Sequence, residues 1–258
     1  MIFLFAYGTY NETIPSAGGN EMKVTVFNGS PRGRTGNTHL IVEPLLEGAI
    51  QAGGDTEEVF LVEHDIKHCL GCFSCWGKTP GKCVHNDDMA SLIALFIDSD
   101  YVGLATPVYG MFMTALLKKF TERLIPLNMP YINKNTDGSF FHDGRVKRFP
   151  RQFMIANAGF PGEHNFDLLK AYMALQNPVL EIYRNCGELL RNRELVTSPV
   201  TQKKISDYFQ ALRDAGSEIV NHGHVSVEIM KKINENLITD EEYMALVNQG
   251  WDEELKGI

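Results

Sequence analysis

The sequence lacks the features that mark several large classes of protein. Its 258 residues hold 24 lysines and arginines against 32 aspartates and glutamates, so the basic excess typical of nucleic-acid-binding surfaces is missing. No apolar run is long enough to span a bilayer. The apolar N-terminus has neither a positively charged region nor a clear small-residue cleavage site. We therefore expect a cytoplasmic protein that binds neither nucleic acid nor membrane.

Two common nucleotide-binding motifs are missing as well. Gly77, Lys78 and Thr79 match the end of the motif G-x-x-x-x-G-K-[ST], but Cys72 stands where the first glycine is required. No G-x-G-x-x-G follows the first expected strand, so a dinucleotide-type site is not supported. There is also no internal repeat and no low-complexity segment.

The chain does alternate short β-rich runs with helical patterns between residues 22 and 183. This alternation predicts parallel strands joined by helical crossovers, which is an α/β fold with a doubly wound, five-stranded parallel sheet. Segments 22–28 and 101–105 are apolar on both faces and should be central or nearly so. The expected strands are 23–28, 57–62, 101–105, 152–156 and 179–183, and the helices between them are 37–52, 88–97, 114–125 and 164–175.

Three parts of the chain are predicted on this basis. Residues 1–21 form an N-terminal extension, 22–200 form the main domain, and 201–258 form a C-terminal helical extension. Residues 127–150 are rich in proline, glycine, asparagine and aspartate, which indicates an inserted loop or hairpin. The extension should contain helices at about 202–220, 225–237 and 240–249.

In doubly wound sheets, ligands bind outside the carboxyl ends of the strands, so the loops that follow the strands are candidate sites. The loop at residues 28–38 leaves the first strand and enters a helix. Its glycines allow backbone amides to turn toward one point, and Ser30, Thr35 and Thr38 add hydroxyls. These features favour phosphate binding, and an ordinary polar turn is the alternative.

The loops after the third and fourth expected strands are also candidates. In the first of them a proline stiffens the turn, Tyr109 offers a flat aromatic surface, and Gly110 permits close approach of a ligand. The alternative is a rigid turn between a strand and a helix. The candidate residues of these two loops are Pro107, Val108, Tyr109, Gly110, Met111, Asn157 and Gly159.

Four of the five cysteines fall within fifteen residues, in the pattern Cys-x2-Cys-x2-Cys-x7-Cys. Three closely spaced thiolates suit a cuboidal iron–sulfur cluster, which a fourth thiolate closes. A zinc site and reduced free thiols are alternatives, although zinc held by four cysteines usually draws on two separated pairs. The predicted metal ligands are Cys69, Cys72, Cys75 and Cys83.

Residues 22–190 resemble the NADPH-dependent FMN reductase group of the flavodoxin-like superfamily. The resemblance rests on segments 28–38, 72–76, 81–83, 87–89 and 106–109. It implies a flavodoxin-like fold that binds FMN non-covalently, with the flavin ring along residues 107–111 and with Asn157 and Gly159 beside the ring or the nicotinamide. The residues that it implies for the FMN phosphate or ribityl chain are Ser30, Arg32, Thr35, Gly36, Asn37 and Thr38.

The cysteine spacing points to a second group in the same superfamily. It resembles the iron–sulfur flavoproteins, which pair FMN with [4Fe-4S]. In contrast, Trp76, residues 78–81 and the run Asp87-Asp88-Met89 resemble FMN reductases without a cluster, in which this loop caps the flavin. Both interpretations stay open. From the residues themselves, the two aspartates of that run are expected to begin a helix.

We therefore expect an NAD(P)H-dependent FMN reductase-type oxidoreductase that passes electrons to a flavin, a quinone or another small acceptor. No side chain is assigned a catalytic role. The alternative is an electron carrier that relays electrons from a ferredoxin-like donor through FMN and [4Fe-4S]. A regulatory module on the same fold is a third interpretation, which nothing in the sequence favours. Self-association as a homodimer or homotetramer is expected.

Overall fold

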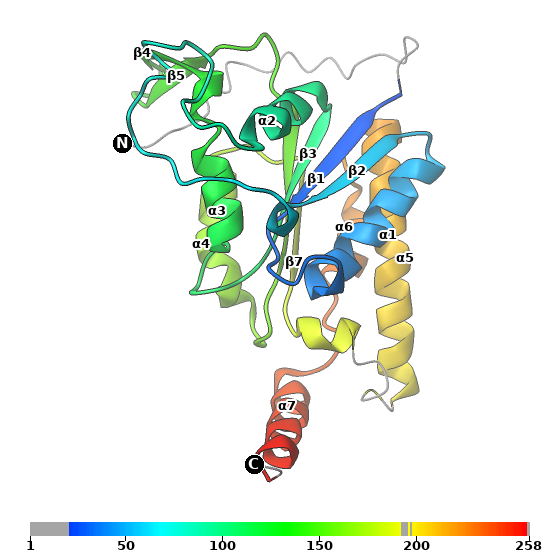
Figure 1. Cartoon of the computed structure of the whole chain (residues 1–258). Coiled ribbons are helices and arrows are strands. Elements are labelled where there is room, and N and C mark those ends of the chain that lie inside the picture. Colours follow the sequence, from blue (N-terminus) through cyan, green and yellow to red (C-terminus); the bar gives the residue numbers. More distant parts are fainter. Residues whose placement is uncertain (1–20, 192–195, 197, 257–258) are drawn as a thin grey trace.

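The computed structural model describes residues 21–191, 196 and 198–256, so the predicted N-terminal extension lies almost wholly outside the described residues. Figure 1 shows a single central sheet with helices on both faces. The sheet has five parallel strands in the order β2-β1-β3-β6-β7. They are β1 (Lys23–Asn28), β2 (Asp55–Phe60), β3 (Tyr101–Pro107), β6 (Arg151–Asn157) and β7 (Leu180–Arg184).

This architecture confirms the predicted flavodoxin-like fold class. β3 is the central strand and every residue in it is buried, while β1 lies beside it with neighbours on both sides. The two segments expected near the centre of the sheet are therefore there. An apolar strand covered by helices on both faces has no polar side to expose, which is why its sequence does not alternate.

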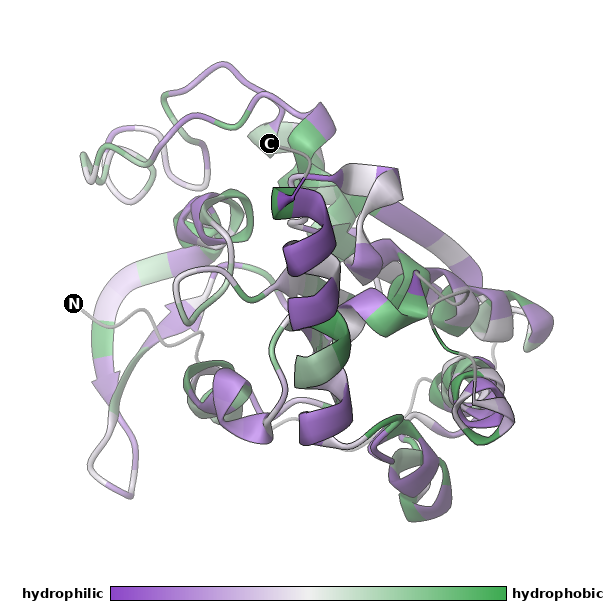
Figure 2. Cartoon of the chain, turned by 90° about the horizontal axis from the view of Figure 1, so that it is seen from below, coloured by the Kyte–Doolittle hydropathy of each residue, from purple (hydrophilic) through white to green (hydrophobic). Residues whose placement is uncertain are grey.

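Two layers of helices cover the sheet and form two separate apolar cores. One layer contains α1 (Asn37–Gln51), α5 (Pro199–His222) and α6 (Val227–Ile233). The other contains α2 (Met89–Asp98), α3 (Ala115–Glu122) and α4 (Asp167–Ala174). Most of these helices carry both hydrophilic and hydrophobic residues along their length, as amphipathic helices do (Figure 2).

The long helix α5 packs directly along α1 (Figure 1). Its apolar residues belong to the same core as those of β1 and β3. Gly48 in α1 and Gly216 in α5 allow the two helices to approach closely. The Ser217 hydroxyl donates a hydrogen bond to the Gly48 carbonyl, 2.8 Å away. The division of the chain at residues 21 and 200 stays a prediction, but the first helix after residue 200 completes the layer over the sheet.

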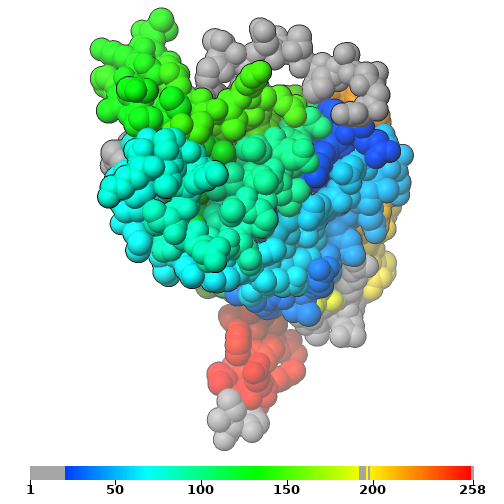
Figure 3. Space-filling view, turned by 45° about the horizontal axis from the view of Figure 1, so that its top comes forward, coloured from blue at the N-terminus to red at the C-terminus, as the bar shows by residue number. Residues whose placement is uncertain are grey.

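Two elements extend from the body at opposite ends (Figures 1 and 3). An antiparallel hairpin of β4 (Asn128–Lys134) and β5 (Phe140–Gly144) lies at one end, within the segment predicted to be an inserted loop or hairpin. The helix α7 (Asp240–Leu255) lies at the other, and Tyr243 is its one buried residue. The described helices include none that is long and apolar enough to cross a membrane.

Several element boundaries differ from the sequence predictions. The second strand covers Asp55–Phe60 instead of 57–62, because Leu61–Glu63 turns into the short 3-10 helix η2. The third helix ends at Glu122 instead of 125, and η3 (Ile125–Leu127) follows with a proline near its start. Proline lacks the amide that would continue the longer helix. The fourth begins at Asp167, after η4 (Glu163–Phe166).

Candidate functional site

The three loops predicted to form the site follow β1, β3 and β6, which are neighbours in the sheet. Because these strands are parallel, the three loops leave the sheet at its same, carboxyl edge. The chain passes from β1 outward to β2, whereas β3 lies on the opposite side of β1. The strand order therefore reverses between β1 and β3, which is where doubly wound sheets bind ligands.

Asn157, at the end of β6, joins the three loops. Its side-chain oxygen accepts a 2.7 Å hydrogen bond from the hydroxyl of Thr38 in α1. Its backbone carbonyl accepts a 2.8 Å hydrogen bond from the amide of Val108 in the loop after β3. Both Asn157 and Thr38 are buried. These bonds fix the relative positions of the loops before any ligand binds.

A second connection joins the loop after β1 to that after β3. The Thr114 hydroxyl donates to the Gly29 carbonyl at 2.7 Å, and the Gly29 amide donates to Ala105 at 2.8 Å. Glycine is required here because a Cβ atom would lie 2.6 Å from the Cβ of Leu117. The loop therefore begins in close contact with α3.

We call residues 28–38 the phosphate loop. Asn28 organises its start, because its side chain accepts from the Ser30 amide at 2.8 Å and donates to Glu58 at 2.7 Å. The loop then forms η1 (Gly33–Thr35) and enters α1 after Gly36, where no side chain caps the helix. The first amides of a helix have no partners within it, so an uncapped N-terminus suits an anion such as phosphate.

The predicted FMN-binding residues divide by burial. Arg32, Thr35, Tyr109, Gly110, Met111 and Gly159 are exposed, and Val108 is half-buried. The buried members are Ser30, Gly36, Asn37, Thr38, Pro107 and Asn157. The buried side chains contact other parts of the protein, whereas the exposed ones also face solvent. Their roles in binding FMN stay a prediction.

Two residues at this site were not predicted. Glu188, in η5 (Gly187–Leu190), accepts a 2.8 Å hydrogen bond from the Asn37 side chain and lies 3.6 Å from the Arg32 guanidinium. Arg191 donates to the Asn37 side chain at 3.0 Å and also to the Thr35 carbonyl. The segment after β7 thus holds the phosphate loop from outside. The sequence signal that could have indicated them is the presence of two charged residues, Glu188 and Arg191, shortly after the fifth strand.

The loop after β3 presents apolar side chains at the carboxyl edge. Gly110 and Met111 both have positive φ angles, of 55° and 67°, and Tyr109 and Phe112 bond to each other through their backbones. This tight turn leaves Tyr109 52% and Met111 56% exposed, and Phe160 in the loop after β6 is 75% exposed. Flat apolar groups at this edge suit an aromatic ring system.

The four clustered cysteines lie in a different part of the molecule. We call residues 67–87 the cysteine loop, which runs beside the β4–β5 hairpin (Figures 1 and 3). The Trp76 indole donates to the carbonyl of Ile125 at 3.2 Å, and its ring contacts that of His142. The loop therefore packs on the hairpin and on the end of α3, whereas the phosphate loop packs on Asn157 and η5.

The cysteines influence one another electrostatically. Burial raises the pKa of the Cys75 thiol, and the neighbouring charges of Cys83, Cys69 and Cys72 raise it further. The pKa of the exposed Cys72 is lowered, chiefly by the Ser74 backbone amide. All four are free thiols. Within residues 21–191, 196 and 198–256, however, no three His, Cys, Asp or Glu side chains are grouped to hold a metal ion. The predicted ligand set stays a prediction.

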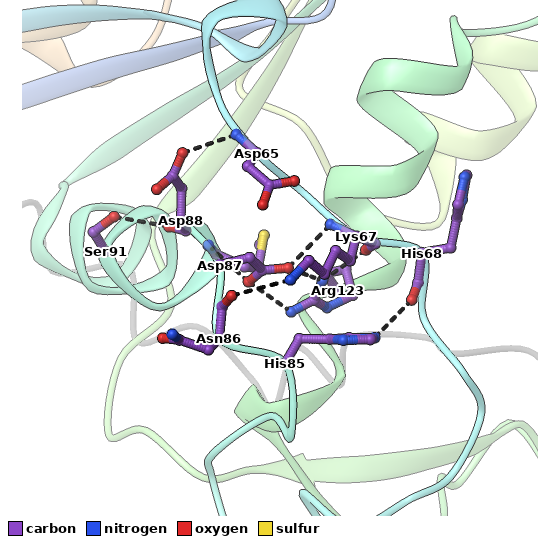
Figure 4. Close-up of polar contacts among 10 residues, drawn as sticks. Asp65, Lys67, His68, His85, Asn86, Asp87, Asp88, Ser91 and Arg123 are labelled. Atoms are coloured by element: carbon purple, nitrogen blue, oxygen red, sulfur yellow. Dashed lines mark hydrogen bonds and ion pairs between the residues drawn. The ribbon is translucent and has the colours of Figure 1, made fainter.

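A buried ion pair closes the base of the cysteine loop (Figure 4). The Arg123 guanidinium donates to the two carboxylate oxygens of Asp87 at 2.6 and 3.1 Å, and each side chain is 1% exposed. The sequence predicted that Asp87 and Asp88 begin a helix. Asp88 does stand at the start of α2 and Asp87 accepts from the Met89 amide, but the main partner of Asp87 is Arg123.

This pair predicts a specific loss of stability in acid. Burial alone would raise the pKa of Asp87, but hydrogen bonds from Arg123 and from the amides of Lys67 and Met89 lower it to about 2, from an ordinary 3.8. Because the folded-state pKa is the lower one, the ionised carboxylate stabilises the fold above pH 3.8 and loses that effect as the pH falls toward 2. The expected contribution is about 2 kcal/mol.

Denaturant unfolding at neutral pH and at about pH 3 measures how much the ionised Asp87 carboxylate stabilises the fold. The difference in the free energy of unfolding between the wild type and Asp87→Asn should become smaller at the lower pH. A difference that stays constant over that range would contradict the assignment.

Comparison with known proteins identifies the class. The sequence profile of the NADPH-dependent FMN reductase family matches residues 22–138. An iron–sulfur flavoprotein of Methanocaldococcus jannaschii is 30% identical over 154 residues, which cover 60% of this chain and 76% of that protein. One from Archaeoglobus fulgidus is 38% identical over 105 residues, or 41% of this chain and 46% of its own length. The chain therefore spans about half of one relative and three-quarters of the other.

Solved structures agree on the fold. An FMN-dependent NADH-azoreductase from Bacillus anthracis superposes with a TM-score of 0.54 at 14% identity and covers 78% of this chain and 100% of its own. An NAD(P)H:quinone oxidoreductase from Methanothermobacter marburgensis has a TM-score of 0.55 at 14% identity. The superposition covers 80% of this chain and 100% of that protein.

The fold is thus that of the flavodoxin-like flavoproteins. The chain belongs to the family of iron–sulfur flavoproteins, and residues 22–138 match the profile of the NADPH-dependent FMN reductases.

Proposed function

We propose that this protein is an FMN-dependent NAD(P)H oxidoreductase that passes electrons to a flavin, a quinone or another small acceptor. One observation carries the proposal: Asn157 joins three loops at the switch point of the sheet, beside an uncapped helix start. Such an arrangement presents backbone amides to a phosphate and a preformed surface to a ring. The match of residues 22–138 to the FMN reductase family supports the same conclusion.

The residues divide into those that would contact FMN and those that hold the site. Exposed Arg32 and Thr35, with the first amides of α1, would bind the phosphate. Residues 108–111, with Gly159, would lie along the ring. Buried Ser30, Asn37 and Thr38 keep the phosphate loop in shape through their hydrogen bonds. Bound FMN would accept hydride from the nicotinamide, and this chain would bind and orient both partners without a general acid or base.

Rapid mixing of the FMN-loaded protein with NADH or NADPH under anaerobic conditions tests this function. The oxidised flavin absorption band should bleach within seconds for at least one nicotinamide, and adding a quinone should restore it. A protein that binds FMN but is not reduced by either nicotinamide would contradict the reductase proposal. That result would not contradict the proposed FMN-binding site.

A second candidate function is electron transfer through FMN and a [4Fe-4S] cluster, from a ferredoxin-like donor. Two observations favour it: the four free thiols share one loop, and the buried Nε of Arg123, at the base of that loop, has no hydrogen-bond partner among the described residues. A buried cationic donor without an acceptor fits an anionic sulfur centre. The ligands would be Cys69, Cys72, Cys75 and Cys83.

Iron and acid-labile sulfide per chain, after anaerobic reconstitution, test the cluster. Cys75→Ser should lose most of both, whereas Cys186→Ser should keep them, because Cys186 is buried in the opposite core. Values near zero in the wild type with FMN still bound would leave a plain FMN reductase.

Glu188 should weaken phosphate binding in the wild type. Its carboxylate lies against Asn37 and Arg32, where a phosphate would be repelled and would compete for the same donors. Glu188→Gln keeps the size and one hydrogen-bond acceptor but removes the charge. We expect FMN to bind about five times more tightly, from roughly 1 kcal/mol of relieved repulsion at an exposed site.

Fluorescence quenching of FMN by the apo protein measures this change. Glu163→Gln, on the exposed side of η4, is the matched control and should bind FMN like the wild type. Equal or weaker binding by Glu188→Gln would show that this carboxylate does not face the phosphate.

We also propose that the protein forms a homodimer or homotetramer in the cytoplasm. Exposed Tyr109, Met111 and Phe160 at the carboxyl edge support association, because apolar groups around a flavin are commonly covered by a second subunit. The free cysteines support a reducing compartment.

A further inference from the structure

The loop after β6 is held in place through its backbone carbonyls. The Ala158 carbonyl accepts a 2.9 Å hydrogen bond from the Gly187 amide, and the Phe160 carbonyl accepts one of 3.3 Å from the Cys186 amide. Both donors belong to the turn that follows β7 and enters η5. The carbonyl between these two, that of Gly159, accepts from a side chain 84 residues further along the sequence.

That side chain is Tyr243, in the first turn of α7. Its hydroxyl donates to the Gly159 carbonyl at 2.8 Å, and its ring is 2% exposed in the same apolar core as η5. Burial raises the pKa of Tyr243, so the hydroxyl keeps its proton and stays a donor. A capping box of Thr239 and Glu242 fixes the start of the helix just before it. The C-terminal helix, which extends beyond the carboxyl edge of the sheet (Figure 1), therefore anchors a loop of the candidate site.

The engaged carbonyls determine where the amides of this loop point. No peptide in the described part of the chain is cis, and in a planar trans peptide the C=O and N–H groups point in opposite directions. The Gly159 amide shares a peptide with the Ala158 carbonyl, and the Phe160 amide shares one with the Gly159 carbonyl. Both amides therefore point away from η5 and α7.

The side of the loop to which these two amides point is open. Among the described residues, neither the Gly159 nor the Phe160 amide has a hydrogen-bond acceptor. A Cβ atom on Gly159 would meet no other atom within 4 Å, and Phe160 is 75% exposed. Two adjacent amides thus face open space at the edge of the sheet where Asn157 joins the three loops.

We propose that Tyr243 is a positioning residue that turns the Gly159 and Phe160 amides toward the ring of bound FMN. The inference rests on the proposed function. Two adjacent donors suit the polar edge of a flavin ring, which becomes more electron-rich on reduction, so donors fixed there stabilise the reduced flavin more than the oxidised one. Tyr243 does not contact the ring and acts only through the peptide that it holds.

Tyr243→Phe tests this role, because it removes the hydroxyl and leaves the aromatic ring in the core. The variant should bind FMN and riboflavin more weakly by the same factor, about fivefold, since both flavins carry the same ring. Fluorescence quenching of each flavin by the apo protein measures the affinities. The midpoint potential of bound FMN should also become more negative in an anaerobic titration, which a loss of stability alone would not cause.

Tyr101→Phe is the matched control. Tyr101 is 1% exposed, its hydroxyl has no hydrogen-bond partner among the described residues, and it lies at the start of β3, the end of that strand opposite the site. This variant should match the wild type in flavin affinity and in potential. Gly159→Ala is a second test, because it places a methyl group in the open space beside the two amides. It should weaken the binding of both flavins at least as much as Tyr243→Phe, with the free energy of unfolding unchanged.

The outcomes separate this inference from the function on which it rests. A Tyr243→Phe variant with the flavin affinity and potential of the wild type would overturn the positioning role while FMN binding stands. Wild-type affinity in Gly159→Ala would show that the two amides do not face the ring, which would overturn it as well. A wild type that binds neither flavin would overturn the proposed function, and this inference with it.

Discussion

Replacing Gly48 or Gly216 by alanine should lower the free energy of unfolding by about 3 kcal/mol. These glycines lie where α1 crosses α5. A Cβ atom on Gly48 would come within 1.8 Å of the Arg213 carbonyl oxygen, and one on Gly216 within 1.9 Å of the Leu45 carbonyl oxygen. Both neighbours are backbone atoms, so the clash is relieved only by moving the helices apart. Denaturant unfolding of each variant measures the loss.

Gly250→Ala is the matched control. Gly250 is also a helical glycine, but it lies in the exposed α7 and nothing would come within 4 Å of its Cβ atom. This change should leave stability unchanged or raise it by up to about 1 kcal/mol, because alanine favours a helix more than glycine does. If Gly48→Ala were as harmless as Gly250→Ala, α1 and α5 would not be packed as described.

Thr35→Glu should weaken FMN binding by at least about a hundredfold. Thr35 is exposed in η1, directly before the uncapped start of α1, so a carboxylate there would occupy or repel the phosphate position. At a separation of about 5 Å and an effective dielectric constant near 20, each like-charge pair costs about 3 kcal/mol. The fold should be unharmed, since a negative charge near a helix N-terminus is favourable. Titration of the apo variant with FMN gives the affinity.

Gln51→Glu adds the same charge at the opposite, exposed end of α1. Its FMN affinity should equal that of the wild type. If both variants bound FMN equally well, the helix start would have no part in the site. If both bound equally weakly, the effect would come from net charge and not from position.

Features carried by local patterns could be predicted from the sequence. The five strands follow from short β-rich runs, and the central position of β3 follows from its apolar character on both faces. The loops at the carboxyl edge follow from the fold rule for doubly wound sheets. The hairpin at 128–144 follows from its turn-forming composition, and the errors of a few residues at element ends reflect short 3-10 turns.

Features made by contacts between distant residues could not be predicted. Glu188 meets Asn37 across 151 positions, and Thr38 meets Asn157 across 119. Nothing local in the run around Asp87 distinguishes a helix start from a buried ion pair, because its partner lies 36 residues further on. The placement of the cysteine loop beside the hairpin likewise depends on Trp76 reaching Ile125. Pairings of this kind are set by the tertiary structure.

The central claim is that the phosphate loop and its neighbours bind FMN through its phosphate. Parallel titrations of the apo protein with FMN and with riboflavin, which lacks the phosphate, test this most directly. The account predicts one FMN per chain and riboflavin binding weaker by at least about a hundredfold, as expected for the loss of several charge-assisted hydrogen bonds. Equal affinity for the two flavins, or no binding of either, would contradict it.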